Sequence, residues 1–197
     1  AKQYADANES AIHKIASIVE EKNIDCDFAW RPAYVYTQSN KYVKKIEDEV
    51  DAAASLGIKA SYLEDIPLPF SIQSAVRFDE QAQFHPVKYL LALAEDVKNS
   101  DSYIFENTEA VDIADGEPCT VTTRTGKKVT ASKVIIASHF PFFDGGGLYF
   151  ARMYAEKSYI IGLKAKDRFP EGMFITAEDP GRSLRSQNCD NGELILI

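Results

Sequence analysis

A short apolar run at residues 133–138 constrains the fold of this chain more than any other feature. Valine, isoleucine and alanine follow one another there without the alternating polar side chains of a strand that has one wet face. Such a run is typical of a strand buried in a sheet. A stretch that closes like a hairpin through Thr125, Gly126 and Lys127 precedes it, and a further strand is expected at residues 103–107. The middle of the chain is therefore expected to form strands of a buried sheet.

Helices and strands are expected on both sides of this region. Residues 6–9 resemble a capping box, Ser39 or Asn40 can cap a second helix that stops at Gly57, and Pro86 suits the first position of a third helix. The predicted fold class is α+β, with a mixed or antiparallel sheet and flanking helices. Helices are expected at about residues 6–22, 40–57 and 86–99, and strands at 27–37, 72–78, 158–165, 172–177, 183–187 and 193–197.

Composition narrows the functional class. The 197 residues are 45% hydrophobic, which suffices for a normal core, and the formal net charge of −8 argues against nucleic acid and anionic membranes as partners. The three cysteines, Cys26, Cys119 and Cys189, form no C-x-x-C pair, so neither a disulfide framework nor a zinc site is expected. The sequence contains neither a signal peptide nor an apolar stretch of membrane-spanning length, and a reducing, cytoplasmic location is predicted.

The order of the elements over nearly the whole chain resembles the glycine/D-amino-acid oxidase family of FAD-dependent oxidoreductases. In that family, part of a substrate domain precedes a proline-led helix, a short strand, a β-ribbon and the last strand of the dinucleotide-binding domain. The chain then returns to the substrate domain through antiparallel strands. The resemblance implies three segments, namely substrate-domain helices and strands at 1–79, part of the FAD-binding domain at 80–140, and a substrate-domain antiparallel sheet at 141–197.

The family also opens with a G-x-G-x-x-G turn that holds the FAD pyrophosphate on a helix N-terminus. The sequence contains no such turn, and its one glycine cluster, Gly145 to Gly147, is followed by Phe150 where the third motif glycine would fall. The resemblance thus implies an internal fragment that lacks the N-terminal turn and a C-terminal part. We expect the fragment alone to be inactive and to bind no FAD. Whether a Rieske-type iron-sulfur domain follows, as in some bacterial members, stays open.

The resemblance also implies cofactor contacts. Val111 matches the position whose backbone meets the adenine of FAD, and Ala137 and Ser138 match the Ala-Thr/Ser-Gly ending near the pyrophosphate. His139 stands in place of the usual glycine, which would permit a closer backbone approach. From the sequence alone, Val111 is more simply read as a core valine of an ordinary strand, and residues 138–139 can equally face solvent.

Substrate contacts are expected from arginine, because its planar fork suits an amino acid's carboxylate. Arg182 and Arg185 lie at or in a predicted strand, where alternation places them on opposite faces, so at most one points into a pocket. Tyr149 could line the flavin face, although tyrosines in a sheet commonly pack in the core with the hydroxyl at its rim. For each arginine taken singly, a solvated surface position is the simpler reading. Arg31, Arg77 and Arg152 are the remaining candidates.

Three functions therefore stay open. The first is a fragment of a flavin-dependent enzyme that oxidises an amine or amino acid by transferring a hydride equivalent to FAD. The second is an independent module that binds a ligand or partner without redox activity, and the third is a lone enzyme of another type. In the first case, loss of the parallel neighbours of residues 134–137 would expose a strand edge, so either a homodimer of the fragment or a rearrangement of this segment is expected.

Overall fold

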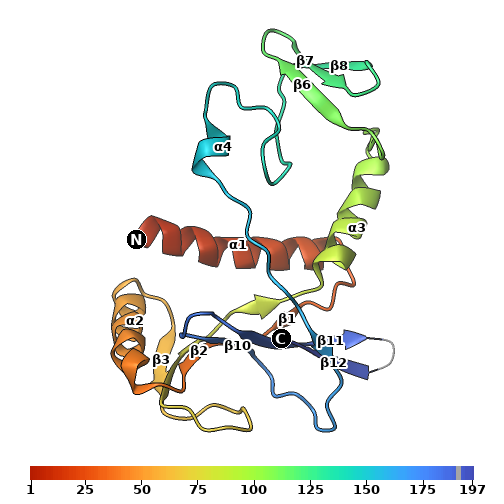
Figure 1. Cartoon of the computed structure of the whole chain (residues 1–197). Coiled ribbons are helices and arrows are strands. Elements are labelled where there is room, and N and C mark those ends of the chain that lie inside the picture. The colour runs from red at the N-terminus through yellow and green to blue at the C-terminus, as the bar shows by residue number, and fades with distance from the viewer. Residues whose placement is uncertain (190–191) are drawn as a thin grey trace. The chain divides into compact units, whose positions relative to one another are not determined.

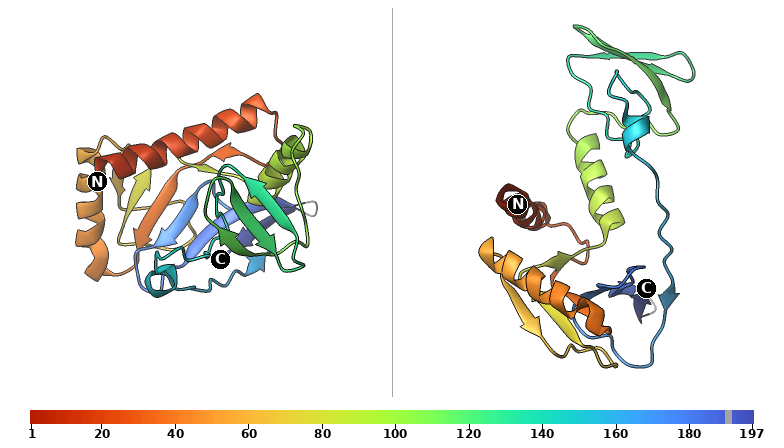
Figure 2. Two further views of the ribbon diagram at one scale, coloured as in Figure 1. Left: turned by 90° about the horizontal axis from the view of Figure 1, so that it is seen from above. Right: turned by 60° about the vertical axis from the view of Figure 1, so that its left-hand side comes forward.

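The computed structural model of the chain describes residues 1–189 and 192–197. They form two compact units, one made of Ala1–Asp96 with Ile160–Ile197 and the other of Val97–Tyr159 (Figure 1; Figure 2 gives further views). These boundaries differ from the expected divisions at 79/80 and 140/141, because the third helix belongs mainly to the first unit. The assignment of segments to substrate and flavin domains stays a prediction.

A seven-stranded mixed sheet forms the centre of the first unit, in the order β3-β4-β2-β10-β11-β12-β9. All neighbours are antiparallel except β2 and β10, which are parallel and join the two chain segments of this unit. Helices beside this sheet give the expected α+β architecture. The strands are β2 (Ala33–Thr37), β3 (Ala60–Leu63), β4 (Ser74–Phe78), β9 (Gly162–Leu163), β10 (Met173–Thr176), β11 (Ser183–Cys189) and β12 (Gly192–Leu196).

The helices of the first unit largely confirm the expected positions. The Ser39 side chain accepts a hydrogen bond from the Lys41 N–H and starts a short 3-10 turn that leads into α2. Gly57 follows that helix with a φ of +80°, the conformation expected of a glycine stop. The capping box at residues 6–9 was wrong, because the first helix already begins at Lys2. The helices are α1 (Lys2–Glu21), α2 (Val43–Ser55) and α3 (Pro86–Lys98).

A two-stranded pair, β1 (Ala29–Trp30) with β5 (Ala82–Gln83), lies beside α1. The Trp30 ring contacts Phe28 edge-on at 5.4 Å between centroids and lies 5.5 Å from the His13 ring of α1. Trp30 is 45% exposed. Its strand has only two residues, so one side of the indole stays open to water.

Aromatic rings from both chain segments form the core on one face of the large sheet. Tyr34 of β2 and Phe174 of β10 are register partners and stack with centroids 4.7 Å apart and an angle of 8°. Phe169 meets the Phe174 ring edge-on at 5.7 Å, and the proline-rich loop after β3 contributes Ile66 and Leu68. The parallel pairing therefore also carries the main aromatic contact of the core.

Glu178 ties the loop after β10 to the end of β2. One of its carboxylate oxygens accepts hydrogen bonds from the Thr37 hydroxyl at 2.7 Å and the Gln38 N–H at 2.8 Å. Burial raises the pKa of the Glu178 carboxyl, but the hydrogen bonds from Thr37 and from backbone N–H groups outweigh it, so the pKa lies below its ordinary value. At pH values above the ordinary carboxyl pKa of about 4.3, the ionised Glu178 side chain therefore stabilises this junction. That stabilisation is lost as the pH falls through the lowered value.

The second unit contains a three-stranded antiparallel sheet, β6-β7-β8. The turn between β7 and β8 confirms the expected hairpin, with Gly126 at a φ of +78° and the Lys127 N–H bonded to the Thr123 hydroxyl at 3.0 Å. Its elements are β6 (Ala110–Ala114), β7 (Cys119–Thr123), β8 (Lys128–Ala131) and α4 (Tyr149–Arg152).

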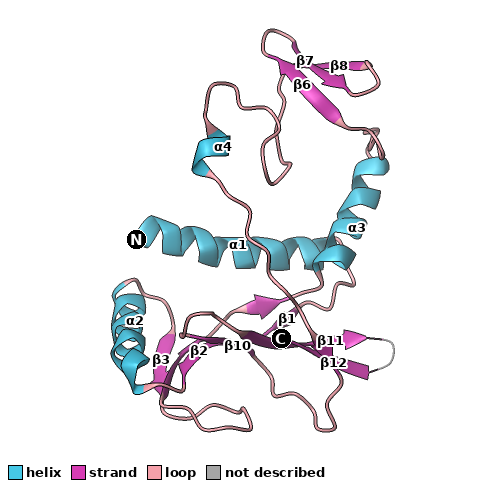
Figure 3. Cartoon of the chain, in the orientation of Figure 1, coloured by secondary structure: helices cyan, strands magenta, loops and turns pink. Residues whose placement is uncertain are grey.

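Two strands expected in the second unit are absent. Residues 103–107 and 133–138 are loop, as Figure 3 shows by colour, and within the described residues no strand pairs with either. Ile135 is 90% exposed and Tyr103 is 82% exposed. A strand forms only where a neighbour completes its backbone hydrogen bonds, and these apolar runs have no such neighbour here. The strand expected at 158–165 is likewise reduced to the two residues of β9.

Candidate functional site

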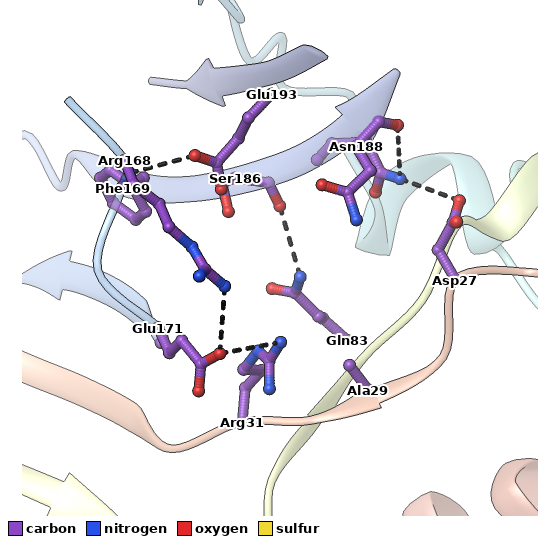
Figure 4. Close-up of a pocket in the computed structure, with 12 residues that line it drawn as sticks. Asp27, Ala29, Arg31, Gln83, Arg168, Phe169, Glu171, Ser186, Asn188 and Glu193 are labelled. Carbon is purple, nitrogen blue, oxygen red and sulfur yellow. Dashed lines mark hydrogen bonds and ion pairs between the residues drawn. The ribbon is translucent and has the colours of Figure 1, made fainter. Parts of the chain in front are cut away.

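A polar pocket of about 300 Å³ lies in the first unit, at the end of the aromatic core. Its walls come from the β1–β5 pair, the loop that leads into β10, and the β11–β12 hairpin (Figure 4). Phe169 and the backbone of Gly172 form its buried inner surface. The charged and amide side chains in its lining are Asp27, Arg31, Gln83, Arg168, Glu171, Gln187, Asn188 and Glu193.

Two guanidinium groups share one carboxylate at the pocket mouth. An Nη of Arg31 and an Nη of Arg168 each lie 3.5 Å from the same oxygen of Glu171 (Figure 4). Arg31 is held from behind, because its backbone N–H bonds to the Gln81 carbonyl at 2.8 Å and its side chain donates to the Trp30 carbonyl at 3.2 Å. The Arg31 side chain is 31% exposed and that of Arg168 is 80% exposed, so Arg31 is the fixed member of the pair.

The opposite wall is built on Asp27 and Gln83. One oxygen of Asp27 accepts from Lys88 at 2.8 Å and from the Gln187 amide at 3.0 Å, which links the start of α3 to β11. Asp27 has a φ of +54°, a left-handed conformation that aspartate tolerates better than most residues. The Gln83 amide donates to the Ser186 carbonyl at 3.3 Å. These contacts fix the β1–β5 pair to the hairpin that closes the pocket.

Glu193 and Gly172 shape the inner end. A Glu193 oxygen accepts from the Phe169 N–H at 3.0 Å, so β12 anchors the loop that carries Arg168 and Glu171. Gly172 has a φ of +143°, and a Cβ there would lie 2.9 Å from a ring carbon of Tyr34. Only glycine allows this loop to turn so closely over the core.

The substrate residues expected from the sequence do not gather in this pocket. Arg182 and Arg185 are exposed residues of the first unit, and Tyr149 opens α4 in the second unit. Arg185 lies opposite Leu196 in the β11–β12 register, and it follows Leu184, which packs against the aromatic core. Because side chains alternate along a strand, Arg185 extends from the face opposite that core. Its role in substrate binding stays a prediction.

The four expected cofactor residues all belong to the second unit. The β6–β7 register shifts between Ala110 and Asp112, so Val111 is the extra residue of a β-bulge. Such a residue is left out of the ladder, which leaves its backbone open to a ligand. Ala137, Ser138 and His139 form an exposed loop, and His139 has a φ of +65°. His139 thus has a left-handed backbone conformation, which glycine adopts more readily than other residues.

The sequence interpretation missed most of the pocket. Arg31 was among the five candidate arginines, but Asp27, Gln83, Glu171 and Glu193 carried no motif. They come from four separate parts of the chain and meet only through the parallel β2–β10 pairing and the β1–β5 pair. A polar residue inside a two-residue strand gives no periodic signal, so no local pattern could have found Gln83.

Other site types find little support. The three cysteines are free, and burial raises the pKa of the Cys26 thiol. Across residues 1–189 and 192–197, no group of three His, Cys, Asp or Glu side chains is placed to hold a metal ion. Within the same described residues, no helix is both long and apolar enough to cross a membrane.

Comparison with known families decides the class of protein. Residues 1–196 match the family model DAO, described as FAD dependent oxidoreductase. The chain belongs to this family. It is also 41% identical over 197 residues to the "Putative Rieske 2Fe-2S iron-sulfur protein YhfW" of Bacillus subtilis (strain 168), covering all of this chain and 39% of that protein. The chain thus spans well under half the length of this curated relative.

Solved structures show the same fold. Glycine oxidase from Bacillus cereus ATCC 14579 superposes with a TM-score of 0.73 at 19% identity over 98% of this chain and 55% of that one. Glycine oxidase from Geobacillus kaustophilus gives 0.69 at 15% identity over 95% and 51%. L-amino acid deaminase from Proteus vulgaris gives 0.66 at 13% identity over 93% and 45%. At identities this low, the structural similarity shows only that the folds are alike. It does not show which substrate this chain helps to bind.

Proposed function

We propose that this chain is the middle part of a flavoenzyme that oxidises an amine or amino acid by transferring a hydride equivalent to FAD. The observation that carries the proposal is the family match over residues 1–196. The names of the structural neighbours, glycine oxidase and L-amino acid deaminase, supply the substrate class. The complete enzyme is expected to act in the cytoplasm on a small molecule.

In the complete enzyme, the second unit would hold part of the cofactor. The bulged backbone at Val111 suits contact with the adenine, and the loop at Ala137, Ser138 and His139 suits the pyrophosphate region. Ser138 is already held, because its hydroxyl donates to the Phe140 carbonyl at 2.8 Å. When bound, FAD supplies the hydride acceptor, so the residues of this chain have to position groups rather than react with the substrate.

Substrate orientation falls to Arg182, Arg185 and Tyr149. Arg185 is the preferred carboxylate ligand, because it extends from the sheet face opposite the aromatic core and is not paired with an acidic side chain among the described residues. A guanidinium fork binds a carboxylate through two parallel hydrogen bonds and thereby fixes the carbon next to nitrogen.

Cofactor content tests this proposal directly. This chain, purified alone, is expected to be colourless and to gain no flavin absorbance when dialysed against FAD, because the sequence offers no glycine turn to hold the pyrophosphate. A full-length protein that includes this chain is expected to be yellow, with about one FAD per chain, and to reduce that flavin under anaerobic conditions with an amine or amino acid. The measurement is the visible spectrum before and after addition of substrate.

The matched variant is Arg185→Gln in the full-length protein. It should keep its flavin while the rate of flavin reduction by an amino acid falls by about tenfold or more, since a charge-assisted contact contributes about 1.5–3 kcal/mol. Reduction by a simple amine without a carboxylate should change little. A stoichiometric yellow complex of this chain alone would contradict the need for the missing turn, and a full-length protein without flavin would contradict the function.

A second function, an independent ligand-binding module, is favoured by one observation. The pocket of the first unit is lined entirely by residues of that unit, so it needs no flavin-binding segment for its walls. A ligand retained by this chain in the absence of flavin would support this reading.

Self-association of this chain is a further proposal. Ile135 and Ile136 are 90% and 39% exposed in a loop that has no strand partner within the described residues, and Phe105 is 66% exposed. Unpaired backbone next to apolar side chains favours pairing with a second copy. Light scattering after size-exclusion chromatography should give the mass of a dimer, and Ile135→Lys should shift it toward the monomer. A monomer at high concentration would refute the proposal.

A further inference from the structure

The pocket of the first unit carries charges of both signs. Arg31 and Arg168 share the Glu171 carboxylate, which leaves one positive charge on the arginine side, and Lys88 balances Asp27 at 2.8 Å. Glu193 supplies the remaining negative charge of the lining. A site with one net charge of each sign is complementary to a small zwitterion and a poor match for a polyanion or a polycation.

The arginine side has donor capacity to spare. Both guanidinium groups lie 3.5 Å from the Glu171 oxygen, which is longer than the 2.7–2.9 Å of a strong charge-assisted hydrogen bond. Each guanidinium carries five N–H donors, and Arg31 uses one of them on the Trp30 carbonyl. A ligand carboxylate can therefore bind to this pair in place of, or beside, Glu171.

The opposite requirement, acceptors for an ammonium group, is met by the inner wall. Glu193 uses one oxygen for the Phe169 N–H, and Gln83 uses its amide N–H for the Ser186 carbonyl. In the part of the chain that the structure describes, the second Glu193 oxygen and the Gln83 amide oxygen accept no hydrogen bond from another residue. Figure 4 places Gln83 between the arginine side and Asp27, with Glu193 extending over the same space. An ammonium group has three donors and suits two or three such acceptors.

We propose that this pocket binds a free α-amino acid as its zwitterion, with the carboxylate on Arg31 and Arg168 and the ammonium on Glu193 and the Gln83 amide oxygen. The volume of about 300 Å³ lies at the small end of ligand pockets, which fits one amino acid better than a peptide or nucleotide. The pocket is lined by Arg31, one of the candidate arginines, but by none of the expected cofactor residues and not by Arg182, Arg185 or Tyr149, so the proposed binding requires neither the flavin nor Arg185.

The test is a titration of the ¹⁵N-labelled chain with three matched probes. L-Alanine carries both charges, propionate lacks the ammonium and ethylamine lacks the carboxylate. L-Alanine should shift the amide signals of Gln83, Ser186 and Phe169 in a saturable way. Propionate and ethylamine should each bind at least about tenfold more weakly, because each loses one set of charged hydrogen bonds.

Variants locate the two ends of the ligand. Arg31→Gln and Glu193→Gln should each weaken L-alanine binding by about tenfold. The glutamine amide oxygen can still accept the Phe169 N–H, so Glu193→Gln keeps the loop anchored. Arg168→Gln, at an 80% exposed side chain, should weaken binding without any risk to the fold. The matched control is Arg124→Gln, at an exposed arginine of the second unit, which should leave L-alanine binding unchanged.

Three results would overturn the proposal, namely no saturable shift with L-alanine, propionate binding as tightly as L-alanine, or an Arg124→Gln variant that loses binding while Arg31→Gln retains it. The titration contains no flavin. Its failure would therefore leave the proposed oxidation by the full-length protein standing, and failure of flavin reduction would leave this binding standing.

Discussion

Replacing Phe174 with alanine is expected to lower the free energy of unfolding of the first unit by about 3–5 kcal/mol. The side chain is 2% exposed and stacks on Tyr34, its register partner across the parallel strands. Phe169 packs edge-on against the Phe174 ring, so a cavity at position 174 would loosen the loop that carries Arg168 and Glu171. Phe174→Ala should therefore destabilise the wall of the pocket as well as the core.

Urea unfolding followed by tryptophan fluorescence is the suitable measurement, because Trp30 is the only tryptophan and lies in the first unit. The matched control is Phe105→Ala at a 66% exposed phenylalanine of the second unit, where a change within about 0.5 kcal/mol is expected. If Phe174→Ala unfolded at the same urea concentration as the unchanged chain, the aromatic contact between β2 and β10 would not be holding the two segments together.

Gly172→Ala should lower the free energy of unfolding of the first unit by about 2–4 kcal/mol, through two effects that act together. The φ of +143° strains any residue that has a Cβ, and the new methyl group would lie 2.9 Å from Tyr34 and 3.0 Å from Phe174 ring carbons. Tyr34 is 5% exposed and cannot swing aside. The same fluorescence measurement applies, and L-alanine binding in the neighbouring pocket should weaken in parallel.

Two other glycines separate these effects. Gly57 has a φ of +80°, and no atom lies within 4 Å of a Cβ added there. Gly57→Ala should therefore lower the free energy of unfolding through backbone strain alone, by about 1 kcal/mol. Gly181 has no positive φ, and the nearest atom to a Cβ added there is 4.0 Å away. Gly181→Ala should therefore leave the free energy of unfolding nearly unchanged. Equal losses at Gly172 and Gly57 would mean that the clash with the aromatic rings contributes nothing.

Local chemistry made several elements predictable. Ser39 and Gly57 bracket the second helix, Pro86 opens the third, and Gly126 closes the β7–β8 hairpin, all within one or two residues of the expected places. Each signal depends on backbone conformation and hydrogen bonds over a few residues. Capping box chemistry at residues 6–9 misled, because helical spacing continues upstream to Lys2 and nothing in the motif forbids a longer helix.

Buried strands were predicted less well than turns. The apolar run at residues 133–138 has the composition of a central strand, yet it is loop in this chain. Composition reports that the side chains would be stable in a core, while strand formation also needs a neighbouring backbone. The same reasoning explains why the strand expected at residues 103–107 does not form, where Tyr103 and Phe105 are exposed.

By itself, the sequence determined the family, the α+β class, and the helices and hairpins whose signals lie within a few residues. Only the tertiary structure decided that β2 pairs with β10, whose residues lie far away in the chain, and that Arg31, Gln83, Glu171 and Glu193 line one pocket. The physical reason is range. Caps and turns act between residues close in the chain, whereas the pocket depends on closing a loop of more than a hundred residues, and no local pattern encodes which distant polar groups then meet.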